Sequence, residues 1–145
     1  MKRLVISLAF VVGVAAAGTP AFAQQSGNVR IEFQGPGGHS SGAYGRVSAL
    51  HAAARTVILI QKALPARSYQ ITNLTGGNSV NAIASDGLIE MKLMAANEAA
   101  YKALVAAVTK AAAEGAAAEN AFRGVKPGDL TAGAPATIRS IVKPS

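Results

Sequence analysis

The stretch "NVRIEFQGPGGHSSGAYGRVSALHAAARTVILIQKAL", residues 28–64, contains a strand pattern, a glycine-rich loop and a helix pattern in that order. In its first residues Val29, Ile31 and Phe33 alternate with polar neighbours, which is the period of a half-buried strand. After the loop the apolar period becomes three or four residues, which is typical of an amphipathic helix from Val47 to Leu64 that ends before Pro65. The expected apolar stripe of this helix comprises Val47, Leu50, Ala54, Val57 or Ile58, and Gln61.

The rest of the chain adds three strand patterns and one long helix. Strands are expected over 68–75 and 87–95, with the irregular segment "TGGNSVNAIASDG" between them. A helix is expected over 96–122, capped by Asn97, and Gly115 in its alanine-rich half is expected to mark fraying or an end. A last strand is expected over 137–143. This order predicts an α+β, ferredoxin-like βαββαβ fold, a four-stranded antiparallel sheet with two helices on one face.

The N-terminal residues are typical of a secretory signal peptide. Lys2 and Arg3 precede an uncharged apolar run, residues 4–18, and Ala21 and Ala23 then form the small-x-small pattern of a cleavage site. The run is shorter than the roughly 20 residues that span a bilayer, so a stable membrane anchor is not expected. We therefore expect a signal peptide at 1–23, a single domain at 24–145, and export to the periplasm or the extracellular space.

Charge and cysteine content narrow the class of protein. The formal charge of +7 falls to +5 once Lys2 and Arg3 are removed, since residues 1–23 hold no acidic side chain. This excess is modest and spread along the chain, so no nucleic-acid partner is expected. The absence of cysteine excludes a disulfide framework.

Two motifs carry a family resemblance. "GPGGHSSGAYGRVSALHAAARTV" (35–57) and "TGGNSVNAIASDGLIEMKL" (75–93) resemble the dimerisation, or lid, domain of zinc metallopeptidase family twenty, which includes carboxypeptidase G, aminoacylase and peptidase T-like enzymes. The resemblance covers residues 29–118. It implies a ferredoxin-like domain that is normally inserted in a zinc-binding catalytic domain and pairs two subunits through its outer helix and a strand edge. The implied partner is a second copy or a catalytic domain.

The resemblance also implies roles for four residues. His39 would reach the partner subunit's active site and stabilise an oxyanion, Asn81 would contact bound substrate, and Gly76 and Gly77 would form the tight turn before it. The residues alone favour a His39 that bonds to nearby backbone of its loop, and they leave open whether Asn81 orders its loop or contacts substrate. The chain departs from the family pattern at two positions, with Ala84 in place of the usual proline and Met94 in place of an arginine that grips a substrate carboxylate.

Catalysis by this chain alone is not expected. The only histidines are His39 and His51, and the seven acidic residues form no ligand pattern, so neither a metal nor another cofactor is predicted. His51 is expected to pack or cap beside the helix stripe. Ser40, Ser41 and Ser48 lie near the histidines in sequence, but no nucleophile elbow and no buried aspartate accompany them, which argues against a serine hydrolase.

The sequence therefore predicts an exported, stand-alone lid domain that acts through self-association or with a catalytic partner. The contact would use the first helix, with Leu59 or Ile60 pointing outward, and the sheet edge. The alternative is a small periplasmic binding module that uses the His39 loop for anionic ligands.

Overall fold

The computed structural model describes residues 24–145, and the predicted signal peptide lies outside this range. The main elements are β1 (Gln25–Gln34), α1 (Ala49–Ala63), β3 (Tyr69–Thr75), β5 (Asp86–Ala95), α2 (Glu98–Phe122) and β8 (Arg139–Pro144). The loops contain two short two-stranded ladders. One pairs β2 (Gly38–His39) with β4 (Ala82–Ile83), and the other pairs β6 (Leu130–Thr131) with β7 (Ala134–Pro135). Within residues 24–145 no helix is long and apolar enough to cross a membrane.

The four long strands form one antiparallel sheet in the order β3-β5-β1-β8. β1 and β5 pair over their whole length, from Gln25 opposite Ala95 to Gln34 opposite Asp86. A register shift between Ile71 and Asn73 interrupts the pairing of the edge strand β3 with β5. The predicted α+β fold class, with both helices on the antiparallel sheet, is confirmed.

The two ends of the domain lie side by side. β8 pairs with β1 so that Pro144 lies opposite Val29. The backbone N–H of Ser145 donates to the carbonyl of Asn28 at 2.9 Å. The last residue of the chain is therefore fixed next to the start of the first strand.

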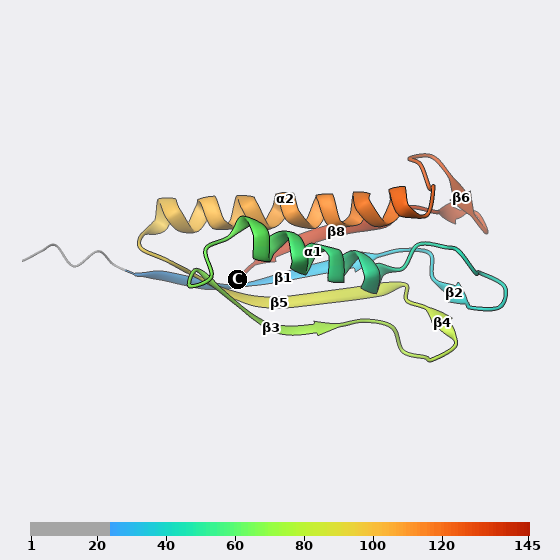
Figure 1. Ribbon diagram of the computed structural model, residues 1–145, viewed down its shortest axis with the longest axis horizontal. Helices are drawn as coiled ribbons and strands as arrows, with labels where there is room; N and C mark the ends of the chain where they lie inside the picture. Colours follow the sequence, from blue (N-terminus) through green and yellow to red (C-terminus); the bar gives the residue numbers. More distant parts are fainter. Residues whose placement is uncertain (1–23) are drawn as a thin grey trace, which may run out of the picture.

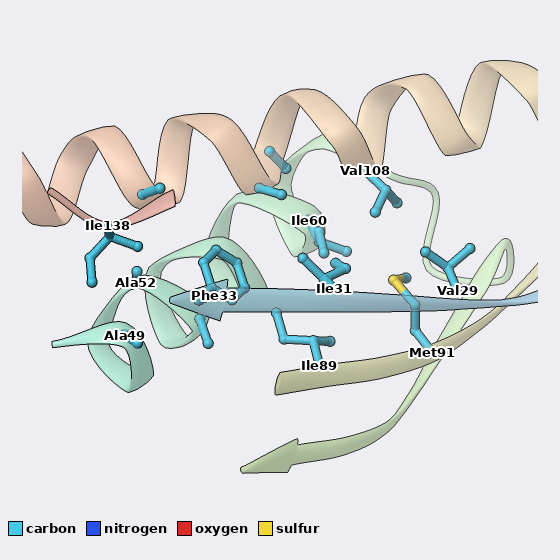
Figure 2. Close-up of a cluster of buried hydrophobic side chains, with 14 of the residues drawn as sticks. Val29, Ile31, Phe33, Ala49, Ala52, Ile60, Ile89, Met91, Val108 and Ile138 are labelled. Atoms are coloured by element: carbon cyan, nitrogen blue, oxygen red, sulfur yellow. The ribbon is translucent and has the colours of Figure 1, made fainter. Parts of the chain in front are cut away.

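The helices cover one face of the sheet and leave the other open (Figure 1). The covered face presents the alternating apolar residues of β1, and Ile89 and Met91 of β5 join them in the core with Ile60 of α1 and Val108 of α2 (Figure 2). The open face carries the polar positions of the same strands. There Arg30 Nη1 lies 2.9 Å from Glu90 Oε1, and Lys143 Nζ lies 2.8 Å from Glu32 Oε2. The alternation along β1 thus decides which face the helices bury.

The helix α1 buries a different stripe from the predicted one. Its buried residues are Ala49, Ala52, Ala53, Thr56 and Ile60, whereas Ala54 and Gln61 of the expected stripe are exposed. The predicted phase was wrong because alanines occur on several sides of this helix, so the apolar period alone does not fix which side faces the sheet. The helix starts two residues later than predicted, since Ser48 is the N-cap and its Oγ accepts from the His51 N–H at 3.4 Å.

The outward side of α1 also differs from the expectation. Ile60 is fully buried, and Leu59 is half-buried beside Ala107 and Ala111 of α2. Ile58 is the outward-facing residue, with 52% of its surface exposed. The prediction was therefore wrong for Ile60, and Ile58 takes its place as the exposed apolar residue of this helix.

The helix α2 is continuous through Gly115, so the predicted fraying or end at that position was wrong. Its predicted N-cap is confirmed, since Asn97 Oδ1 accepts from the Ala100 N–H at 2.9 Å. Gly115 is buried where α2 packs on α1: a Cβ there would overlap Thr56 Oγ1 and lie 3.0 Å from the Ala52 carbonyl oxygen. The glycine lets the two helices approach more closely than any other residue would allow.

Candidate functional site

The structure brings His39 and Asn81 together. The short ladder of β2 and β4 places His39 opposite Ala82, and the Ser40 N–H donates to the Asn81 carbonyl at 2.9 Å. The side-chain Nδ2 of Asn81 lies 3.1 Å from His39 Nε2. Two residues that lie 42 positions apart in the sequence therefore form one exposed pair.

The hydrogen bonds around this pair fix its orientation. The Ser79 hydroxyl donates to Asn81 Oδ1, which turns the Nδ2 group toward the imidazole. His39 Nε2 then accepts from Asn81, while its Nδ1 lies 2.8 Å from Ser41 Oγ. Nδ1 of His39 thus has its partner in its own loop and Nε2 has its partner in the facing loop, and the side chains of His39 and Asn81 remain exposed.

Gly76 and Gly77, which the resemblance assigns to a tight turn before Asn81, directly follow β3. Gly77 has a φ of 71°, in the left-handed region that favours glycine. A Cβ on Gly76 would lie 2.5 Å from the Asp86 carbonyl oxygen, so only glycine fits against the start of β5. The backbone therefore requires glycine at both positions that precede the 78–82 loop.

A cavity of about 570 Å³ lies beside these loops, and we call it the basic pocket. Three of its lining residues are basic, Arg46, His51 and Arg123, and none is acidic. His51 was expected to pack or cap, yet its side chain is 57% exposed at this pocket. His39 and Asn81 lie outside the lining. The complete lining is Tyr44, Gly45, Arg46, Ser48, Leu50, His51, Gly76, Gly77, Asn78, Ser79, Val80, Ala82, Ile83, Ala84 and Arg123.

A buried carboxylate next to the pocket was missed by the sequence analysis. The Glu119 side chain is fully buried and accepts from the Ser48 N–H at 3.1 Å, from Arg55 Nε at 3.0 Å and from Arg123 Nε at 3.2 Å. His51 Nδ1 lies 3.8 Å from the same carboxylate. These contacts join the end of α2 to the start of α1.

Glu119 is held in its ionised form. Burial raises the pKa of its carboxyl group, but the hydrogen bonds from Ser48, Arg55 and Arg123 outweigh that effect and hold the pKa below its ordinary value. The spacing of Glu119 and Arg123, four residues apart on one helix, is a signal that the sequence offers for this cluster. The contributions of Ser48 and Arg55 depend on the tertiary fold.

The carboxylate of Glu119 does not complete a serine hydrolase triad. The sequence analysis expected no buried aspartate beside the serines, and the buried acid near His51 is a glutamate. However, the Ser48 hydroxyl accepts from the backbone N–H of His51 as the cap of α1, and the carboxylate is already satisfied by three donors. Among residues 24–145 no group of three or more histidine or acidic side chains is placed to hold a metal ion.

The sequence profile of the peptidase dimerisation domain matches residues 24–120. The chain belongs to this family. This match confirms the resemblance that the two glycine-containing motifs indicated. None of the curated proteins matches the chain.

Solved structures share the fold at low identity. An aminobenzoyl-glutamate utilization protein from Klebsiella pneumoniae matches with a TM-score of 0.63 at 16% identity, over 88% of this chain and 31% of that one. A hydantoinase/carbamoylase family amidase from Burkholderia ambifaria gives 0.65 at 16% identity, over 86% and 28%. An aminopeptidase from Bacillus cereus gives 0.60 at 17% identity, over 83% and 29%.

The chain thus spans about 30% of the length of these relatives. The family match is confined to the dimerisation domain, and no match to a catalytic domain of these hydrolases is found.

Proposed function

We propose that this domain acts by association, either with a second copy or with a catalytic partner, through α1 and the outer edge of β3. The single observation that carries the proposal is the unpaired edge of β3 next to the uncovered side of α1. Within residues 24–145 β3 is one of the two edge strands of the sheet, so the backbone groups along its outer edge have no partner strand there. A second sheet edge related by a two-fold axis would satisfy them.

Two large apolar side chains are exposed on the two elements of the proposed interface. Ile58 of α1 is 52% exposed and Leu74 of β3 is 44% exposed. Leu74 lies opposite Ile89 of β5, a core residue, and therefore points to the helix-covered side of the sheet. It remains uncovered because α1 does not extend over the outer part of β3 at this point. Burying both residues in an interface would stabilise the pair of subunits.

The outer surface of α2 has the opposite character. Lys102 Nζ lies 2.7 Å from Glu98 Oε1, and Lys110 Nζ lies 3.7 Å from Glu114 Oε1, each pair one helical turn apart and exposed. Such pairs are typical of a helix surface in water. The α1 and β3 side is therefore the better candidate for the interface.

The proposal is tested by the mass of residues 24–145 across a dilution series, measured by sedimentation velocity. Ile58→Glu should shift the protein toward monomer, because a carboxylate would be buried without a partner. The matched control is Leu130→Glu, an equally drastic change at a side chain that is 69% exposed in the β6–β7 hairpin, away from α1 and β3 (Figure 1). It should associate like the parent.

Circular dichroism should show that both variants remain folded, since exposed substitutions change stability by about 0.5 kcal/mol or less. Amide exchange along β3 should slow at high protein concentration in the parent only. A parent that stays monomeric at every concentration, with no catalytic partner to bind, would contradict the proposal, as would equal weakening by both substitutions.

The His39–Asn81 pair would act only within such an assembly. We propose that it contacts substrate at a partner's active site, which its exposure on the β2–β4 ladder supports. To donate Nε2–H to an oxyanion, His39 must exchange its contact with Asn81 for the substrate. In the assembled enzyme, His39→Ala should lower kcat more than it raises KM, whereas an effect on KM alone would oppose the oxyanion role.

Export is a separate proposal, supported by the pattern of residues 1–23. The protein isolated from its host should begin at Gln24 and occur in the periplasmic or extracellular fraction. N-terminal sequencing of the fractionated protein tests this, and a mature chain that still carries Met1 in the cytoplasmic fraction would contradict it.

A further inference from the structure

We propose that the basic pocket binds a small organic carboxylate whose remaining part is apolar. This activity goes beyond association with a partner, since every residue that it needs comes from one copy of the chain. The pocket lies between the 44–46 loop, the start of α1, the 76–84 loop and Arg123.

The charge of the pocket predicts the anionic part of the ligand. Arg46, Arg123 and His51 supply donors, and no acidic side chain lines the cavity. Glu119, the acidic group next to it, is fully buried and directs its carboxylate at Arg123 Nε. A guanidinium group has further N–H donors beyond Nε, so Arg123 keeps donors for a ligand.

The arginines are held in place before any ligand arrives. Arg46 Nη1 donates to the Gly37 carbonyl at 3.3 Å. Arg123 is fixed by Glu119 and by the ring of Phe122, whose centroid lies 5.0 Å from its Cζ. Arg123 Nη2 donates to His51 Nδ1 at 3.5 Å, so the two side chains are adjacent and His51 keeps Nε2 for a ligand. Such preorganisation reduces the entropic cost of binding.

The walls of the pocket predict the apolar part of the ligand. Leu50 and Ile83 line the interior, and its volume falls in the range of about 300 to 1,000 Å³ that small-molecule sites occupy. At the mouth Tyr44 and Val80 leave nearly all of their surface uncovered, at 94% and 108% relative exposure. An inorganic anion would contact the basic side chains but leave the apolar surface in water. A carboxylate with an apolar body would contact the basic side chains and also cover the apolar surface.

Isothermal titration calorimetry of residues 24–145 with three probes tests the assignment. 3-Phenylpropionate should bind, and its neutral amide and inorganic phosphate should each bind at least about tenfold more weakly. Arg46→Gln and His51→Gln should each weaken 3-phenylpropionate binding about five- to tenfold. The matched control is Arg67→Gln, which removes the same charge from an exposed arginine outside the lining and should leave binding unchanged.

Each remaining outcome overturns the proposal. Absence of measurable 3-phenylpropionate binding excludes the site, and equal binding of phosphate shows that the apolar walls contribute nothing. If Arg67→Gln weakens 3-phenylpropionate binding as much as Arg46→Gln does, the ligand is attracted only by the net charge of the protein. Loss of binding in His39→Ala but not in Arg46→Gln would place the anion on the His39 loop instead. Sedimentation of the same samples separates these outcomes from a failure to associate.

Discussion

Replacing Gly115 by alanine should lower the stability of the domain, although alanine is the better helix former. In an open helix this substitution would stabilise by about 1 kcal/mol. At Gly115 the new Cβ would overlap Thr56 Oγ1 and lie 3.0 Å from the Ala52 carbonyl oxygen. The two helices must move apart to admit it, and overpacking of this kind costs about 1 to 3 kcal/mol.

The displaced group also belongs to a hydrogen bond. The Thr56 hydroxyl is buried and donates to the Ala52 carbonyl at 2.9 Å. Moving it would weaken this bond, which adds about 1 kcal/mol to the cost. The three effects together predict a net loss of about 1 to 3 kcal/mol. For a domain of this size that corresponds to a decrease of roughly 4 to 12 °C in Tm.

Urea unfolding of the parent and Gly115→Ala, followed by circular dichroism, measures the difference. The control is Ala113→Gly, an exposed position on the same helix, which should cost about 1 kcal/mol through helix propensity alone. Adding Thr56→Ala to Gly115→Ala removes the overlapping group, so the two changes should couple favourably by at least about 0.5 kcal/mol. A Gly115→Ala variant that is more stable than the parent by about 1 kcal/mol would refute the close approach of the helices.

Three further substitutions test other parts of the structure. Glu119→Gln should lower the free energy of unfolding by about 2 to 3 kcal/mol at neutral pH. Because folding lowers the pKa of this carboxyl group, its contribution is complete above the ordinary pKa and is lost as the pH falls through the folded value. The parent and variant should therefore converge in acid, and a difference that persists at the lowest pH in urea titrations would contradict the ion pairs. Asn97→Ala should cost about 1 kcal/mol by removing the cap of α2, and an unchanged urea midpoint would show that the cap is dispensable. Phe33→Ala should cost about 3 to 5 kcal/mol, because this ring is 1% exposed in the core, and a loss below 1 kcal/mol in thermal unfolding would place the core elsewhere.

The sequence predicts the strands of this fold better than the packing of its helices. The strict alternation around Ile31 allows only one face of β1 to be apolar, so the buried face of the sheet follows directly. In α1, alanines at 52, 53 and 54 are apolar on several sides, and the buried side is decided by contact with α2. Gly115 was misread for the same reason, since its neighbour Thr56 is 59 positions away in the sequence.

Only those residues of the candidate site that belong to a sequence motif could be predicted. His39 and Asn81 were proposed from two separate motifs, and the structure places their side chains 3.1 Å apart. The Glu119 cluster offers only the i,i+4 spacing of Glu119 and Arg123, because Ser48 at the cap of α1 and Arg55 within it reach Glu119 only after both helices pack. The sequence did not predict the basic pocket either, since Arg123 joins Arg46 and His51 only through the tertiary fold.

The hydrogen bond between Ser145 and Asn28 holds the two ends of the domain together, which suits the domain to insertion into another protein. Because its two ends leave the sheet on adjacent strands, the domain can be spliced into a surface loop of a host protein without stretching either connection. The same geometry permits circular permutation, in which a short linker joins Ser145 to Gln24 and new ends open in the 124–129 loop. Such a permutant would retain every strand pairing and both helices while moving its ends to the opposite side of the molecule.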